Sequence, residues 1–449
     1  MKFGGTSVGD ATAIKRTVDI VKRRLDKKPV VVVSALGGAT NTLIAIAEQS
    51  SKGHLIGAMR GVETLRDRHL KECSALLDGA VVVDEVGAEL SAMFDELAHL
   101  AEALSTLGHA TPRAMDAVAA YGEQLSATLV SAVFAERGID AEHVDARAVM
   151  ITDECYMQAE PQTELIAQRA REIVLPILQA GRVPVMGGFV GATTSGVTTT
   201  LGRGGSDYSA SLIGAALGAE AIEIWTDVDG MLTADPRVVE GSRLIEKIRF
   251  DEASELASFG AKVLHPNTIA PAVRLGIPVF VYNSRRPEGK GTLITFDAPH
   301  RAVSAIAGKS DVTVIRVTAA RMLLAHGFLR RVFEIFERHQ TSVDVVATSE
   351  VSVSVTIDDP SHLDALLVDL RDLGDVSIER NRGIIAIVGA GLSDAGGAMG
   401  RALTALGDVK IQMMSLSATG INLTVIVDAD TVKPAMQRLH REFFEGDSR

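Results

Sequence analysis

The sequence predicts an α/β protein in which helices cover both faces of a mostly parallel sheet, followed by a smaller part that is internally repeated. Short β-branched runs alternate with longer amphipathic stretches from residue 1 to about residue 295, as in a parallel sheet between two helical layers. Beyond about residue 300 the pattern changes into two similar units. At 449 residues, the chain is also longer than one hydrophobic core usually supports.

The first part contains recognisable strands and helices. Apolar residues at three- and four-residue spacing predict a helix over residues 83–108, and another is expected over Asn41–Gln49. Short apolar, β-branched runs predict buried strands at Val30–Val33, Val183–Met186, Ile222–Trp225 and Val279–Val281. In such sheets ligands bind at the carboxyl ends of the strands. The glycine-rich segments fall there, so the functional site is expected at that edge.

The second part repeats the order strand, helix, strand, turn, strand, helix. Its second unit ends one strand short, and the apolar run Val303–Ala307 would supply that strand if the first unit were inserted within the second. The predicted boundaries are 1–297 for the first part, 311–383 for the inserted unit, and 298–310 with 384–449 for the surrounding unit. A repeat this small cannot cover its own sheet edge, so pairing between units or subunits is expected.

Composition excludes several classes of function. Lysine and arginine number 45 against 57 acidic residues, a formal net charge of −12, which gives no reason to expect a nucleic-acid partner. No apolar run reaches the roughly 18–20 residues of a membrane span, and the N-terminal residues contain no signal segment. A soluble cytoplasmic protein without a membrane partner is therefore expected. Cys73 and Cys155 are expected to be buried thiols, with no disulfide framework and no metal site.

A lysine, two glycines and two hydroxyl residues occur together at Lys2–Ser7 and are expected to open a helix. The amides of Gly4 and Gly5 would form a nest for an anion, and a helix N-terminus would add positive potential. Lys2 would place a charge where phosphate oxygens gather negative charge during transfer. The spacing differs from G-x-x-x-x-G-K-[ST], so this is not a P-loop. A tight turn with a surface lysine is the alternative for this motif alone.

A second glycine-rich motif, Gly202–Tyr208, opens another predicted helix. Arg203 would provide a fork for a carboxylate, Gly205 would belong to a second nest, and Asp207 would orient a lysine. The alternative is that Arg203 and Asp207 only pair with each other on the surface. Two nests at separate strand ends suit a nucleotide phosphate on one side and an acidic acceptor on the other.

Residues 226–238 and 259–266 form a third, turn-rich group. Its aspartates do not have the spacing of a calcium-binding loop, and His265 is expected to be a structural, hydrogen-bonded residue. Glu123 lies at a predicted helix start, where it would either hold an amine or cap the helix in solvent.

Together these segments resemble the aspartate kinases, and most closely their lysine-sensitive class. The matching motifs are KFGGTSVGD, SALGGATNTL, YGEQLSA, TTTLGRGGSDYSA, WTDVDGMLTADPRV and FGAKVLHP, and the C-terminal repeat is similar to the family's paired ACT domains. The resemblance spans essentially the whole chain. It implies an αβα sandwich of the amino-acid-kinase fold followed by two ferredoxin-like ACT units. It also implies phosphoryl transfer from ATP, with Mg²⁺, to the β-carboxylate of L-aspartate. This is the first step of lysine, threonine and methionine biosynthesis, here with L-lysine as the expected inhibitor and a homodimer or larger assembly.

The resemblance further implies roles for individual residues. Lys2 would neutralise the transferring phosphoryl group, and Asp207 would orient the charged groups around it. Aspartate would be held by Thr40, Glu123 and Arg203; phosphate by Gly4, Gly5, Ser7 and Gly205; the nucleotide by Thr226, Asp227, Arg237 and Lys262; and the effector by Met322, Asp344, Val345 and Ser349. Strand Ser352–Ile357 is expected to form a sheet edge that pairs between subunits.

Two other functions match parts of the sequence. Gly389-x-Gly391 after a strand resembles a dinucleotide fingerprint, but position 411 onward is the repeat's second strand and leaves no room for the βαβ domain that such a site needs. A catalytically silent amino-acid sensor would keep the repeat without the kinase. The presence of Lys2, Arg203 and Asp207 argues against it.

Overall fold

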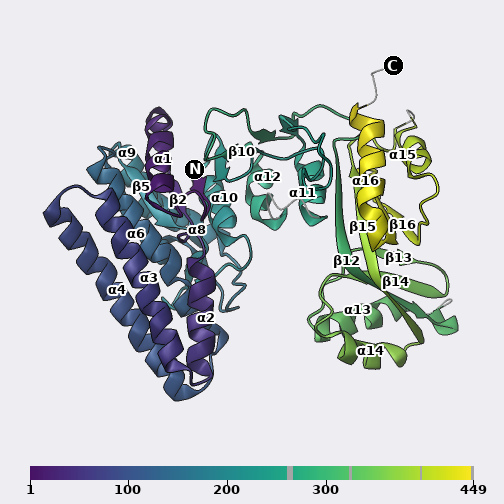
Figure 1. The fold of residues 1–449 in the computed structure, drawn as a ribbon, viewed down its shortest axis with the longest axis horizontal. Helices are drawn as coiled ribbons and strands as arrows, with labels where there is room; N and C mark the ends of the chain where they lie inside the picture. Colours follow the sequence, from purple (N-terminus) through teal and green to yellow (C-terminus); the bar gives the residue numbers. More distant parts are fainter. Residues whose placement is uncertain (260–265, 323–325, 395–396, 446–449) are drawn as a thin grey trace. The chain divides into compact units, whose positions relative to one another are not determined.

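The protein is described by a computed structural model that covers residues 1–259, 266–322, 326–394 and 397–445. The chain divides into two compact units (Figure 1). The first comprises Met1–Met231 and Val263–Phe296, and the second comprises Leu232–Lys262 and Asp297–Arg449. The sequence analysis placed one boundary between the two parts, near residue 297. It did not anticipate that Leu232–Lys262 would group with the C-terminal part.

The first unit is built on a mostly parallel sheet, as predicted. Its strands follow the order β3-β5-β2-β1-β8-β10-β11, and only β11 runs antiparallel to its neighbour. The strands are β1 (Lys2–Phe3), β2 (Val31–Val33), β3 (Ala141–Val144), β5 (Val183–Gly187), β8 (Ile222–Thr226), β10 (Val279–Asn283) and β11 (Thr292–Ile294). A small sheet lies beside it, of β4 (Ile151–Thr152), β6 (Val190–Thr193) and β7 (Thr198–Thr200).

Helices surround this sheet, and α2, α3, α4 and α6 lie side by side in Figure 1. The predicted helices over 41–49 and 83–108 are confirmed as α2 and α4. The helices are α1 (Ala11–Lys22), α2 (Ala39–Ser51), α3 (Leu55–Leu76), α4 (Ala80–Leu107), α5 (Pro112–Ala119), α6 (Tyr121–Glu136), α7 (Ala146–Val149), α8 (Thr163–Arg169), α9 (Leu175–Gln179), α10 (Gly205–Leu217) and α12 (Ala270–Leu275). One core joins Phe3 and Val33 of the sheet to Leu43, Leu90 and Phe134 of the helices.

The first helix begins later than the sequence suggested. Thr6 and Ser7 lie in a turn, and α1 starts at Ala11. The Asp10 side chain accepts a hydrogen bond from the amide of Ala13 and caps the helix. Asp10, and not Thr6 or Ser7, therefore caps the helix, and its first residue lies four positions after Ser7.

The second unit contains one antiparallel sheet in the order β13-β14-β12-β15-β17-β16. Its strands are β12 (Ala305–Thr318), β13 (Val346–Thr348), β14 (Ser352–Ile357), β15 (Asp375–Val388), β16 (Met413–Leu416) and β17 (Asn422–Asp428). The long strands β12 and β15 run through both halves of the sheet (Figure 1). Residues 305–309 pair with 384–388, whereas 313–318 pair with 352–357 and 314–318 pair with 375–379.

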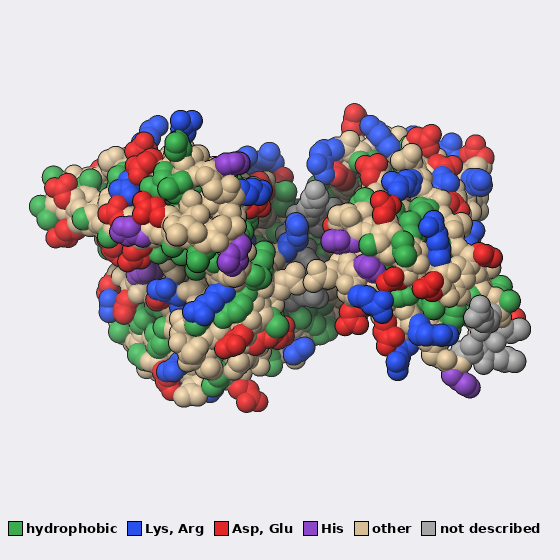
Figure 2. All heavy atoms as spheres, turned by 90° about the horizontal axis from the view of Figure 1, so that it is seen from below, with side chains coloured by type: hydrophobic (Ala, Val, Ile, Leu, Met, Phe, Trp, Pro, Cys, Tyr) green, Lys and Arg blue, Asp and Glu red, His purple; other side chains and the backbone are tan. Residues whose placement is uncertain are grey.

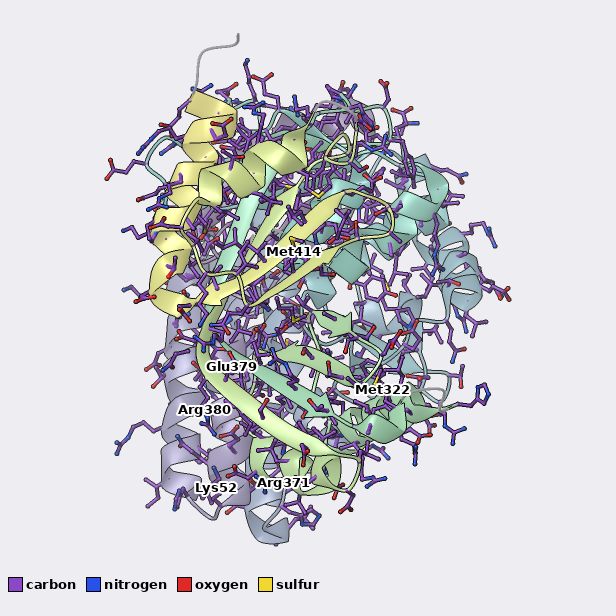
Figure 3. All side chains as sticks on the ribbon, turned by 90° about the vertical axis from the view of Figure 1, so that its right-hand side faces the viewer. Lys52, Met322, Arg371, Glu379, Arg380 and Met414 are labelled. Atoms are coloured by element: carbon purple, nitrogen blue, oxygen red, sulfur yellow. The ribbon has the colours of Figure 1, made fainter. Side chains whose placement is uncertain are left out.

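The two halves of this sheet have separate cores. Helices α13 (Phe328–Arg338) and α14 (Leu363–Arg371) pack in the core that contains Ile315 and Val355. Helices α15 (Ala398–Leu406) and α16 (Val432–His440) pack in the core that contains Ile385 and Val425. Figure 3 shows Met322 in the first half, Met414 on β16 of the second, and Glu379 and Arg380 on the shared strand β15.

Segment Leu232–Lys262 belongs to the second unit and includes β9 (Lys247–Ile248) and α11 (Phe250–Ser258). It packs against the half of the C-terminal sheet that contains Ile385 and Val425. Ala234 and Val239 belong to that half's core. The carboxylate of Glu252 is fully buried and accepts hydrogen bonds from the Ser304 hydroxyl at 2.7 Å and the Ala390 amide at 2.8 Å. The segment is therefore held by buried polar as well as apolar contacts.

Two predictions about this chain are wrong in detail. Strand β14, the SVSVTI segment, lies between β12 and β13, so the edge of the sheet is the shorter strand β13. Cys73 is buried as expected, but Cys155 is exposed.

Acidic and basic side chains are interspersed over the face drawn in Figure 2. Within the described residues, no helix is both long and apolar enough to cross a membrane.

Candidate active site

Lys2 and Asp207 form an ion pair at the carboxyl edge of the main sheet. Lys2 lies on β1, between the parallel strands β2 and β8, and Asp207 lies in the first turn of α10. The Lys2 ammonium is 2.7 Å from Oδ1 of Asp207, and only 10% and 14% of the two side chains are exposed. Arg203 and Asp207 are thus not a surface pair with each other, and the lysine is not a surface lysine.

The first glycine loop is packed tightly against the end of β8 and against the loop after β2. The Gly4 amide donates to the Trp225 carbonyl at 3.0 Å. A Cβ on Gly5 would lie 3.0 Å from the Ala35 carbonyl oxygen, so a larger residue here would push the two loops apart. The Ser7 hydroxyl is buried and lies 2.7 Å from the hydroxyl of Ser284. These contacts hold the loop against its two neighbours.

A cavity of about 710 Å³ opens between the two glycine-rich loops, a size suited to a small-molecule ligand. It brings together seven of the residues singled out from the sequence, which are Lys2, Gly5, Thr40, Glu123, Arg203, Gly205 and Asp207. Gly4 and Ser7 adjoin it through the first loop. Both signs of charge line this cavity, so it offers separate places for an ammonium group and for carboxylate or phosphate oxygens.

Glu123 is a buried carboxyl group at the start of α6. Its Oε1 accepts a hydrogen bond from the Ala35 amide at 3.2 Å, and its Oε2 has no hydrogen-bond partner among the described residues. Burial raises the pKa of Glu123 to about 8, an effect that the charge of Lys2 only partly offsets. The side chain is 4% exposed, so it is not a solvated helix cap. A cationic group in the cavity would satisfy it.

Of the predicted nucleotide residues that the structure describes, Thr226, Asp227 and Arg237 are not among those that line this cavity. Thr226 is the last residue of β8 and Asp227 follows it; the Thr226 carbonyl accepts a hydrogen bond from the Ser284 amide. Arg237 is 79% exposed and forms an ion pair with Asp235 at 2.6 Å. Lys262 and His265 lie outside the described residues.

Two charged residues that the sequence analysis missed, the half-buried Arg68 and the buried Asp116, hold segments that line the cavity. Arg68 of α3 donates to the Gly9 carbonyl and the Gly37 carbonyl, each at 2.7 Å. It thereby joins the first glycine-rich loop to the loop after β2. Asp116 of α5 accepts hydrogen bonds from Met157 and Thr200. Neither residue belongs to a glycine-rich motif, and a charged residue inside an amphipathic helix gives no sign of its partners.

The predicted effector residues lie in the first half of the second unit. Asp344 is paired with Lys309 at 3.2 Å, and Lys309 also contacts Asp358 at 2.5 Å. Burial raises the pKa of Asp344 to about 6, and its Oδ2 has no partner in the described part of the chain. Val345 is buried, and its amide donates to the Thr356 hydroxyl.

The other two predicted effector residues flank this carboxylate in sequence. The exposed hydroxyl of Ser349 contacts that of Ser352 at 2.8 Å in the turn between β13 and β14. Met322 packs against the core of this half.

Comparison with known proteins agrees with this architecture. The profile of the Amino acid kinase family matches residues 1–283, and an ACT domain profile matches residues 385–443. Lysine-sensitive aspartokinase 3 of Escherichia coli is 37% identical, with 99% of this chain and 98% of that protein covered. The chain belongs to the aspartate kinase family.

Other members of the aspartate kinase family match over similar lengths. Aspartokinase 1 of Arabidopsis thaliana, a chloroplast protein, is 34% identical over 99% of this chain and 80% of its own length. The structure of E. coli aspartokinase III with aspartate and ADP superposes with a TM-score of 0.86 at 37% identity, covering 99% of both chains. The same enzyme with lysine and aspartate gives 0.83, covering 99% of this chain and 98% of that one. The amino-acid-kinase fold and C-terminal ACT domains predicted from the sequence are thereby confirmed.

Proposed function

We propose that this aspartate kinase transfers the γ-phosphoryl group of Mg-ATP to the β-carboxylate of L-aspartate, giving 4-phospho-L-aspartate for amino-acid biosynthesis. The observation that carries the proposal is the cavity in which the Lys2–Asp207 pair lies together with Glu123 and Arg203. The bound aspartate and ADP of E. coli aspartokinase III support it.

On the acceptor side, the cavity matches the three charges of aspartate. The buried carboxylate of Glu123 pairs with the substrate ammonium, and the guanidinium of Arg203 binds the α-carboxylate as a fork. Thr40 supplies a hydroxyl to the same cavity. This arrangement leaves the β-carboxylate free to point toward Lys2.

On the donor side, Lys2 neutralises charge on the transferring group, and Asp207 orients the lysine through their ion pair. The amides of Gly4, Gly5 and Gly205, with Ser7, bind phosphate oxygens. Thr226, Asp227, Arg237 and Lys262 bind the nucleotide. Mg²⁺ would be held largely through the phosphates, because it is commonly bound by one or two carboxylates and the substrate oxygens; no cluster of three or more potential ligand residues occurs in the searched, described part of the chain.

We assign residues 1–297 to the catalytic domain, residues 311–383 to the first ACT unit, and residues 298–310 with 384–449 to the second. L-lysine binds the first unit through Met322, Asp344, Val345 and Ser349 and inhibits a cytoplasmic homodimer or larger assembly. The lysine complex of E. coli aspartokinase III supports this choice of effector.

The test is ATP-dependent formation of aspartyl hydroxamate, with glutamate as a matched acceptor one methylene longer. Turnover with aspartate and little with glutamate is expected, and lysine should inhibit where threonine does not. Equal turnover of the two acceptors, or none with aspartate, would refute the proposed substrate.

A further inference from the structure

Asp116 lies in the wall of the cavity, and its carboxylate accepts hydrogen bonds from other residues of the protein. Its side chain is 1% exposed. Oδ2 accepts from the Met157 amide at 2.9 Å and the Thr200 amide at 3.1 Å, and Oδ1 accepts from the Thr200 hydroxyl at 2.5 Å. Burial raises the pKa of this carboxyl group, and the same three hydrogen bonds oppose that effect. Three donors directed at one buried side chain indicate a structural junction.

The two segments that meet at Asp116 both line the cavity. Met157 lies between β4 and α8 and has a φ of 72°, a left-handed conformation that is uncommon for methionine. Thr200 ends β7, two residues before the turn that carries Arg203. The segments are also joined directly, since the Ala159 amide donates to the Thr200 carbonyl at 2.9 Å.

Gly202 fixes how closely these segments approach. A Cβ at this position would lie 3.1 Å from the Met157 carbonyl oxygen. The turn before Arg203 is therefore packed closely against the backbone of Met157. A shift of Met157 would therefore reach Gly202 and Arg203, which follows it.

We propose that Asp116 is a positioning residue for the acceptor side of the active site, where it ties Met157 to Thr200 and thereby fixes the turn that carries Arg203. This inference rests on the proposed function, in which Arg203 holds the α-carboxylate of aspartate. The first glycine loop is held by other contacts, namely those of Gly4 with Trp225 and of Arg68 with Gly9 and Gly37. Loss of Asp116 should therefore affect aspartate more than ATP.

Asp116→Ala and Asp116→Asn form a matched pair. Alanine removes all three hydrogen bonds. Asparagine keeps them without the charge, because its oxygen accepts from the two amides while its NH₂ group donates to the Thr200 hydroxyl. Asp116→Ala should raise KM for aspartate about 10- to 100-fold, as misplacement of a binding group by about 1 Å does, with KM for ATP nearly unchanged. Asp116→Asn should restore most of the loss. Equal impairment of the two variants, or equal changes in both KM values, would overturn the proposal.

Thr200→Val is a milder variant that removes only the hydroxyl bond, and it keeps the test decisive if Asp116→Ala fails to fold. It should raise KM for aspartate by a smaller factor, and an unchanged KM would count against the proposal.

Hydrogen exchange of residues 153–160 and 198–204 should accelerate in Asp116→Ala or, failing that, in Thr200→Val. This readout needs no turnover, so it separates failure of the junction from failure of the proposed reaction, which would appear as an inactive parent protein. Unchanged exchange would overturn the junction itself.

Discussion

The ammonium of Lys2 and the carboxylate of Asp207 lie 2.7 Å apart, although the two residues are 205 positions apart in the sequence. Removal of one preorganised charge at a transferring group typically costs roughly 2.7–4 kcal/mol, or about 100- to 1000-fold in rate. Lys2→Ala and Asp207→Ala should each lose at least that much turnover. Steady-state kcat measured on folded protein checks this expectation, with circular dichroism as the control. Near-normal turnover in either variant would exclude the assigned role.

Trp225 should report nucleotide binding although it is 1% exposed. Its carbonyl accepts from Gly4, and its ring lies 4.8 Å from that of Tyr282. Nucleotide that orders the glycine loop should therefore alter its surroundings. Mg-ATP is expected to change the tryptophan fluorescence more than aspartate does. It is the single tryptophan of the chain, so no other residue contributes to the signal. Unchanged emission at saturating nucleotide would contradict the placement.

Aspartate use should depend on the ionisation of Glu123. Burial raises its pKa to about 8, and only the ionised carboxylate attracts the substrate ammonium. Activity is therefore lost as pH falls through about 8, and kcat/KM for aspartate should drop about tenfold per pH unit below that value. Glu123→Gln should be weaker overall and lack this dependence. A variant that keeps the same pH profile would show that another group titrates.

Lysine inhibition should weaken in acid because the pKa of Asp344 is raised to about 6. Protonation below that pH removes the charge that would attract the effector's ammonium, while Lys309 and Asp358 face the same carboxyl group. The ratio of activity with and without lysine at pH 5.5 and 7.5 measures this effect separately from any change in basal turnover. Asp344→Asn should be poorly inhibited at both values. A parent inhibited equally at the two pH values would contradict the assignment.

Ser349→Leu should separate inhibition from catalysis. Leucine would occupy space at the proposed effector site, in the turn between β13 and β14, and Ser349 is absent from the cavity that contains Lys2. Most uninhibited activity should remain, and most lysine sensitivity should be lost; allosteric couplings are usually about 5- to 150-fold. Inhibition curves against lysine and threonine for both proteins decide the matter. A variant as lysine-sensitive as its parent would refute the role of Ser349.

Local patterns in the sequence predicted most of the fold and much of the cavity. Strand alternation revealed the parallel sheet, and the glycine motifs identified Lys2, Arg203 and Asp207, because these features depend on neighbouring residues. The edge of the C-terminal sheet was misjudged because β13 and β14 have similar patterns, and only their pairing distinguishes them. Arg68 and Asp116 were missed because their partners lie far away along the chain.

The attachment of Leu232–Lys262 to the C-terminal unit limits how an uninhibited enzyme could be engineered. A chain cut at residue 296 would lose the core that covers Ala234 and Val239. It would also remove the Ser304 and Ala390 donors from the buried Glu252 carboxylate, and an orphaned buried acceptor costs about 1–3 kcal/mol or more when charged. Truncation would thus damage a segment proposed to carry nucleotide ligands. Release from feedback control is better sought by point substitution than by deletion.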